Sequence, residues 1–352
     1  PDFERAKTMW EHFYAGEVYR RPLVLAQVHV GPGAPPDSNK RPLWHHCTGN
    51  IQAVLDQIDQ RLTSTAYLGE AIPAFAPNLG PDQFASFLGA ELKFAESSKE
   101  TNWVDPIVED WGDFLPIEFD PNAESFQKLL NITRQYAQHA EGRYLVAHID
   151  KHSHADTLSA LRGPQQFMMD LIEQPDVIER AMQDVRRMYV PIYEMVYDAG
   201  RMGGEKGSAQ LIWSPGKAAI LQCDMIIMIS PALFRKFIIP AIEEEAAYVD
   251  HSIFHTDGVG AFRHLDDLLA IKDLDIIQLT PGAAAAPNHT FVDLFKKILA
   301  AGKSVQVMGN GLTPDRVKVL HKELGPRGVM YCPQCGSVQE AEELMSWLER
   351  NT

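Results

Sequence analysis

Residues 249–258 read VDHSIFHTDG, a short segment with Ile253 and Phe254 at its centre that ends in polar residues and a glycine, as a buried strand and its following turn would. Three similar units follow it and open at about Asp275, Lys303 and Gly328. Their spacing of roughly 24 to 28 residues suits a strand, a short turn, a helix and a return loop. The repeat predicts an α/β fold, and for a chain of this length a (β/α)8 TIM barrel.

The turns after these four predicted strands carry groups suited to metal or carbonyl chemistry. They read His255-Thr256-Asp257-Gly258, Pro281-Gly282, Gly309-Asn310-Gly311 and Cys332-Pro333-Gln334-Cys335-Gly336. In a parallel barrel the carboxyl ends of all the strands face one mouth, and barrel enzymes keep their active sites there. We therefore expect the functional site at that mouth.

The chain has 352 residues, 45% of them hydrophobic, and is expected to form one domain, 1–352. Residues 1–20 read as an N-terminal helix that closes one end of the barrel, residues 21–28 as the first strand, and residues 51–68 as a helix. Residues 70–120 are rich in proline, glycine and aromatic residues and read as an irregular, lid-like insertion. Its aromatic residues suit a lid and a homodimer contact equally well.

Charge and cysteine content exclude several classes of protein. The formal net charge is -15 and no basic run exists, which argues against binding to nucleic acid. Four cysteines are too few and too unevenly placed for a disulfide framework, so a reducing cytoplasm is expected. The apolar stretches are far shorter than a membrane span, and the first residues lack a signal-like core. The sequence predicts a cytoplasmic protein that does not enter a membrane.

Three helix starts are marked by capping residues. Ser230-Pro231 and Thr313-Pro314 each place a hydroxyl at the N-cap and proline at the first helical position. Ser337 and Glu340 form the pattern of a capping box before the last helix.

A metal site can be assembled from the predicted turns. Zinc binds imidazole nitrogen, thiolate sulfur and carboxylate oxygen, and a catalytic zinc keeps one position open. His255 and Asp257 are two residues apart, so in extended backbone their side chains point to the same side. Cys335 comes from the last turn, and Cys332 can replace Asp257 as the third ligand. The alternative is a hydrogen-bonded pair in which Asp257 orients His255 without metal.

Four further residues are candidates for substrate binding, each with a structural alternative. His152 and His154 lie in one loop, which either binds substrate or is simply polar. Asp224 precedes the Ser230 helix beside apolar residues and needs a partner if it is buried, in a pocket or in an ion pair. Asn310 lies between two glycines that allow close approach of a ligand, or a plain tight turn.

Several motifs together resemble one superfamily. Residues 222–240, QCDMIIMISPALFRKFIIP, resemble the "D, then SP..F..F..P" signature of the uroporphyrinogen decarboxylase superfamily, and Leu161-Arg162-Gly163-Pro164 with Asp170-Leu171 resembles its "L-x-G, D-L, P" helix. Residues 255–258 resemble the H-x-C-G turn, and residues 333–336 the P-G-C-G turn, of its corrinoid- and coenzyme-M-dependent methyltransferase branch. The resemblance covers about residues 140 to 350.

This resemblance implies a TIM-barrel methyltransferase with zinc held by His255, Asp257 and Cys335. Asp257 stands where the branch has cysteine, which makes the metal harder and better suited to polarising an ether or amine or to binding water. The methyl group would move between a small methylated compound or thiol and a corrinoid such as methylcobalamin. No D-x-H-x-x-G cobalamin-anchoring motif exists in the chain, so a partner protein would carry the corrinoid.

Two alternatives remain beside methyl transfer. A decarboxylase-like lyase would act on a carboxylated substrate, but uroporphyrinogen decarboxylase has an arginine-rich turn after its first strand, and residues 26–32, AQVHVGP, contain no arginine. The other alternative is a barrel that binds a small molecule without catalysis, because a fold does not determine a function.

Overall fold

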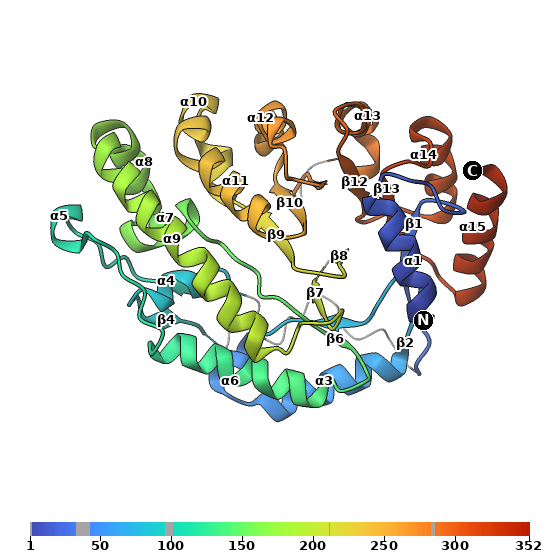
Figure 1. Ribbon diagram of the computed structural model, residues 1–352, viewed down its shortest axis with the longest axis horizontal. Helices are drawn as coiled ribbons and strands as arrows, with labels where there is room; N and C mark the ends of the chain where they lie inside the picture. Colours follow the sequence, from blue (N-terminus) through green and yellow to red (C-terminus); the bar gives the residue numbers. More distant parts are fainter. Residues whose placement is uncertain (1, 33–42, 96–100, 211, 283–285) are drawn as a thin grey trace.

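Strands lie at the centre of the molecule, and an arc of helices surrounds them (Figure 1). The computed structural model describes residues 2–32, 43–95, 101–210, 212–282 and 286–352. The strands are β1 (Leu23–His29), β2 (Thr65–Gly69), β3 (Ala74–Phe75), β4 (Leu92–Lys93), β5 (Trp103–Val104), β6 (Leu145–Ala147), β7 (Gly207–Ala209), β8 (Ile212–Trp213), β9 (Ala218–Gln222), β10 (His251–Asp257), β11 (Ile276–Thr280), β12 (Ser304–Val307) and β13 (Val329–Tyr331).

The helices connect these strands and cover their outer side (Figure 1). They are α1 (Phe3–Tyr14), α2 (Leu43–Thr48), α3 (Ile51–Ser64), α4 (Gln83–Phe87), α5 (Trp111–Phe114), α6 (Glu124–His139), α7 (Ala155–Arg162), α8 (Pro164–Glu173), α9 (Pro175–Ala199), α10 (Pro231–Leu233), α11 (Ile239–Tyr248), α12 (Leu265–Ala270), α13 (Val292–Ala300), α14 (Pro314–Leu324) and α15 (Val338–Asn351). None of the helices in the described ranges is long and apolar enough to cross a bilayer.

The larger sheet has the order β2-β1-β13-β12-β11-β10-β9. Its strands run parallel from β9 to β13 and on to β1, and only β2 is antiparallel to its neighbour. The four strands predicted from the C-terminal repeat are therefore confirmed as β10 to β13. Because they are parallel, their carboxyl ends lie at one edge, as expected. His255 and Asp257 lie inside β10, whose last residue is Asp257, and not in the turn after it.

The second sheet has the order β3-β6-β7-β8, with β3, β6 and β7 parallel and β8 antiparallel. Within the described ranges, no hydrogen-bonded ladder joins this sheet to the larger one. The structure is thus a mixed α/β fold with parallel strands in two separate sheets, and it does not show the closed ring of a barrel.

The N-terminal helix packs against strands of both sheets. It spans Phe3–Tyr14, shorter than the predicted 1–20, and buries Met9, Trp10 and Phe13. These side chains pack against residues of both sheets, namely Leu23, Ala209, Ile212, Trp213, Ala218, Ile253, Ile276 and Met330. The predicted N-terminal helix is thus present, and its buried face packs against strands of both sheets.

The capping residues define helix starts as expected, but one predicted helix is too long. Ser230, Thr313 and Ser337 each accept a hydrogen bond from the backbone N–H three residues on. The helix predicted over 51–68 ends at Ser64, and residues 65–69 form β2. They are extended because they pair with β1, a contact distant in sequence that helical periodicity does not reveal.

The segment 70–120 contains short elements packed against neighbouring helices. Trp111 of α5 is 1% exposed, and its Nε1 donates a 2.7 Å hydrogen bond to Asp170 of α8. Trp103, in contrast, is exposed. The segment is thus anchored to the helical layer through Trp111.

Candidate functional site

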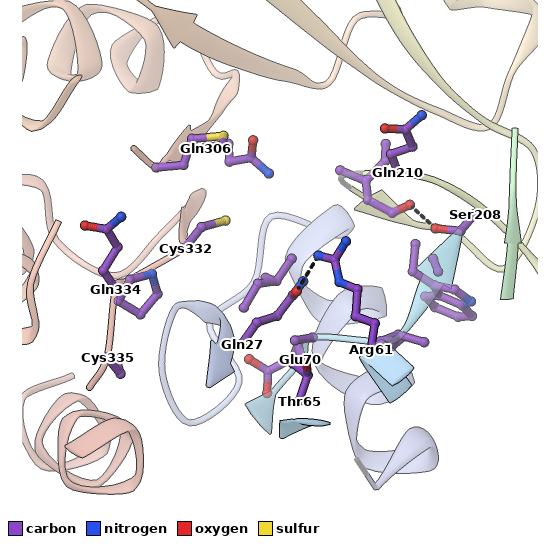
Figure 2. A pocket seen from close by; sticks show the side chains of 18 of the residues that line it. Gln27, Arg61, Thr65, Glu70, Ser208, Gln210, Gln306, Cys332, Gln334 and Cys335 are labelled. Atoms are coloured by element: carbon purple, nitrogen blue, oxygen red, sulfur yellow. Dashed lines mark hydrogen bonds between the residues drawn. The ribbon is translucent and has the colours of Figure 1, made fainter. Parts of the chain in front are cut away.

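A cavity of about 600 Å³ lies between the two sheets, beside the carboxyl ends of β12 and β13. Its walls come from β1, β2, β3, β7, β8, β12 and the turn after β13 (Figure 2). The polar side chains of its lining include those of Gln27, Arg61, Gln210, Gln306, Cys332, Gln334 and Cys335. Side-chain amides both donate and accept hydrogen bonds, so this wall suits a polar ligand of small size.

Two of the predicted metal ligands, Cys332 and Cys335, line this cavity. Cys332 directly follows β13, and its backbone N–H donates to Val307 on β12 at 2.9 Å. Burial raises the pKa of Cys332 to about 12, and burial together with the Glu340 carboxylate raises the pKa of Cys335 to about 11. Both are therefore protonated thiols at neutral pH and need a nearby cation to become thiolates.

A row of polar side chains connects His255 to the cavity. His255, Gln278 and Gln306 occupy paired positions on β10, β11 and β12, so their side chains share one face of the sheet. His255 Nδ1 is bonded to Gln278 Oε1, and Gln278 Nε2 donates to Gln306 Oε1. Gln306 lines the cavity, whereas His255 is two strands away from it.

This row assigns the tautomer of His255. Because Gln278 uses its N–H group to donate to Gln306, its oxygen is left to accept a proton from His255 Nδ1. The neutral imidazole then carries its lone pair on Nε2. No partner for Nε2 occurs within the described ranges, so this nitrogen can accept a proton or bind a metal.

The four predicted metal ligands are not gathered into one centre. Among described residues, the group of three potential ligands whose atoms lie within 4.8 Å of one another is His152, Asp156 and Asp224. His255 is bonded to Gln278, Asp257 is exposed at the end of β10, and the thiols face the cavity. As arranged here, His255, Asp257, Cys332 and Cys335 do not fit a single zinc ion.

The group of His152, Asp156 and Asp224 has the contacts of an ion-pair cluster. His152 Nδ1 lies 3.1 Å from Asp156 and 3.8 Å from Asp224. The Asp156 carboxylate also accepts the backbone N–H groups of Asp224 and Met225 at 2.9 and 3.1 Å. Asp156 therefore joins the start of α7 to the turn after β9, and its oxygens are already occupied by protein donors.

The charges in this cluster stabilise the protonated imidazole of His152. Burial opposes that charge, but the hydrogen bond to Asp156 and the carboxylates of Asp150, Asp156 and Asp224 raise the pKa of His152 to about 9. Partial burial and the carboxylates of Asp156 and Asp257 raise the pKa of Asp224, while His152 opposes this. The cluster thus adjoins the end of β10 and carries mainly negative charge.

The other predicted substrate contacts, His154 and Asn310, are not in the described lining of the cavity. His154 is buried at the start of α7, where its Nδ1 accepts the Ala155 N–H at 2.8 Å. Asn310 is exposed, and its Oδ1 accepts a 3.3 Å hydrogen bond from Gln334, which lines the cavity. Asn310 therefore does not line the cavity itself but contacts Gln334, a residue of its wall.

Sequence reasoning missed the amides and the arginine of the cavity. Gln278 and Gln306 each stand between two apolar residues, in IIQLT and SVQV, which is a signal that polar groups face inward at these positions. Gln27 and Gln210 carry no comparable signal. Arg61 lies near the end of α3, where an arginine is ordinarily a solvated residue.

Comparison with known proteins supports the fold. No family model and no curated protein matches the chain. A solved structure, a methyltransferase from Methanosarcina mazei, is similar to it with a TM-score of 0.60, over 99% of this chain and 98% of that chain. The two sequences are 14% identical, so the similarity is one of fold along the whole length.

Proposed function

We propose that this protein is a methyltransferase of the uroporphyrinogen decarboxylase-like superfamily. It moves a methyl group between a small methylated compound or thiol and a corrinoid carried by a partner protein. The observation that carries the proposal is the pair of thiols, Cys332 and Cys335, in the wall of a cavity between the sheets. The whole-length likeness to a methyltransferase fold and the motifs in residues 222–240 and 333–336 support it.

The two sheets fit this proposal as two arcs of one barrel of parallel strands. Strands β9 to β13 and β1 would form one arc, and β3, β6 and β7 would belong to the other. The cavity is lined by residues of both arcs, as a barrel interior would be. In such an arrangement the carboxyl ends of the strands face the ligand.

Zinc is implied by the resemblance, and His255, Cys335 and either Asp257 or Cys332 are the residues proposed to hold it. Since these side chains do not gather in this structure, we derive no reaction step through the metal. Metal analysis of protein purified without chelator, compared with His255→Ala and Cys335→Ala, tests the site. Wild-type protein without zinc would remove the metal from the proposal.

The chain's own residues have three roles in the proposed reaction. The cavity takes the small substrate out of bulk water, which strengthens each polar contact with it. The amides of Gln27, Gln306 and Gln334 orient the substrate by hydrogen bonds. When His255 binds no metal, its Nε2 lone pair is available to take or return a proton near the rim formed by β10.

Absorption spectroscopy tests methyl transfer directly. Wild-type protein mixed with methylcob(III)alamin and a panel of thiols, or with cob(I)alamin and a panel of methylated compounds, should change the cobalt state. Cys335→Ser should slow this change about tenfold or more, since it removes a thiol that is proposed to take part in the reaction site. Cys47→Ser, a buried cysteine of α2 outside the cavity lining, is the matched control. No cobalt change across both panels would reject the proposal, and turnover of uroporphyrinogen would indicate a lyase instead.

A further inference from the structure

Arg61 is a cation of the cavity wall without a carboxylate partner. Its Nη2 donates a 3.2 Å hydrogen bond to the Gln27 amide oxygen, and its guanidinium lies 5.8 Å from the ring centre of Phe75. Within the described ranges, no carboxylate lies within 4.0 Å of it. Figure 2 shows the guanidinium pointing into the cavity above Gln27. The Arg61 side chain is also hydrogen-bonded to the Tyr67 hydroxyl, and its remaining N–H donors are available to a ligand.

The nearest acidic side chain of the wall does not neutralise Arg61. Glu70 also lines the cavity, but its two oxygens accept hydrogen bonds of 2.7 and 2.9 Å from Arg21. Both of these side chains are fully buried. Glu70 and Arg21 therefore cancel each other's charge, and the local charge that remains is that of Arg61.

An uncompensated arginine stands out in this protein because the formal net charge is -15. An anion that approaches such a protein is repelled unless a local cation attracts it. A guanidinium presents parallel N–H groups that match both oxygens of a carboxylate. The amides of Gln27 and Gln210, which line the same cavity, supply further hydrogen bonds.

We propose that Arg61 binds the carboxylate of a small organic acid in this cavity, and that the acid's opposite end reaches the thiols of Cys332 and Cys335. In Figure 2 the thiols lie on the other side of the cavity from Arg61, on the chain after β13. The inference rests on the proposed function in one respect, because it takes the organic acid to be the methylated substrate of that reaction. Arg61 then determines specificity by excluding neutral compounds of the same size.

Alkylation of the cavity thiols tests this arrangement without requiring catalysis. Iodoacetate and iodoacetamide have almost the same size, and iodoacetate alone carries a carboxylate. The measurement is the rate of alkylation by iodoacetate divided by the rate of alkylation by iodoacetamide, determined for Cys332 and for Cys335 at pH 9 by peptide mass spectrometry. This ratio is then divided by the same ratio for a free thiol peptide. In the wild-type protein this normalised ratio should exceed one.

Arg61→Gln should lower the normalised ratio several-fold, because the cavity loses the cation that attracts the anionic reagent. Arg61→Lys should keep part of the preference, and Arg350→Gln, an exposed arginine of α15, should leave it unchanged. An equal ratio in wild type and Arg61→Gln would overturn the inference. A preference for iodoacetate in a protein without methyl transfer would uphold the anion site and reject the proposed function.

Discussion

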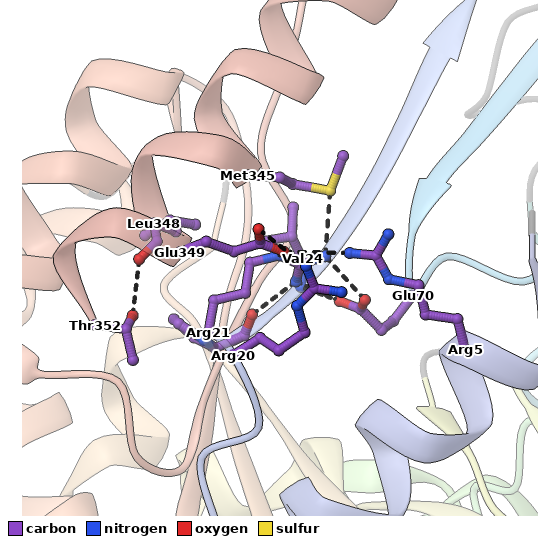
Figure 3. A network of polar contacts seen from close by, with 10 residues as sticks. Arg5, Arg20, Arg21, Val24, Glu70, Met345, Leu348, Glu349 and Thr352 are labelled. Carbon is purple, nitrogen blue, oxygen red and sulfur yellow. Dashed lines mark hydrogen bonds and ion pairs between the residues drawn. The ribbon is translucent and has the colours of Figure 1, made fainter.

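Arg21 and Glu70 form an ion pair from which solvent is fully excluded (Figure 3). Two hydrogen bonds of 2.7 and 2.9 Å join the guanidinium to the carboxylate, and Glu70 also accepts the Val24 N–H at 2.9 Å. The pair thereby ties the start of β1 to Glu70, the residue after β2 and part of the cavity lining. Around it, Arg5 and Arg20 contact Glu349 of α15 at the surface (Figure 3).

Glu70→Ala should destabilise the protein by about 3–5 kcal/mol, because it leaves the buried Arg21 charge with only the more distant Glu349 carboxylate, at 3.9 Å. Chemical denaturation followed by circular dichroism measures this change in the free energy of unfolding. Arg5→Ala breaks only the exposed 3.2 Å pair with Glu349 and should cost less than about 1 kcal/mol. Equal effects of the two substitutions would contradict the assignment of Glu70 as the main partner of Arg21.

Asp170→Ala should cost about 2–4 kcal/mol, since Asp170 is fully buried and collects several donors. Trp111 Nε1 and Arg162 Nε each donate to it at 2.7 Å. Loss of the carboxylate should also release the α5 segment, which limited proteolysis near Trp111 would detect. Trp111→Phe removes one donor and should have the smaller effect. Unchanged stability of Asp170→Ala would show that these contacts contribute little.

The ion pairs of His152 should make stability depend on pH. Its pKa in the folded protein, about 9, is above the ordinary value of 6.5, so its contribution is fully present below pH 6.5 and is lost as pH rises through 9. The difference in unfolding free energy between wild type and His152→Gln should fall by up to about 3 kcal/mol over this range. A difference that stays constant from pH 6.5 to 9 would refute the pairing.

Gln278 should act on the reaction by positioning His255. Gln278→Leu removes the acceptor for His255 Nδ1–H, and we expect the tautomer to become mixed and methyl transfer to slow about tenfold. Gln278→Glu keeps an acceptor at the same place and should preserve most of the activity. Nitrogen NMR of the imidazole measures the tautomer independently of activity. The same tautomer in wild type and Gln278→Leu would exclude this role.

Much of the C-terminal half could be predicted because its signals are local. An apolar run before a turn indicated each strand from β10 to β13, and Ser230, Thr313 and Ser337 marked helix starts through contacts three residues away. The prediction that the helix from residue 51 continues to residue 68 was wrong, because residues 65–69 are held extended by β1, some forty residues earlier in the chain. Local patterns contain no information about that partner.

The composition and periodicity of the chain were enough to establish its α/β class, its parallel strands and the edge at which polar groups collect. They were not enough to show which of those groups meet. Cys332 and Cys335 share a cavity with Gln27 and Arg61, whereas His255 is held apart by Gln278 and His152 is bound in its own cluster. The reason is physical. Strand and helix patterns depend on neighbours a few residues away, but contacts across a cavity depend on how whole sheets pack and on which buried charges find partners.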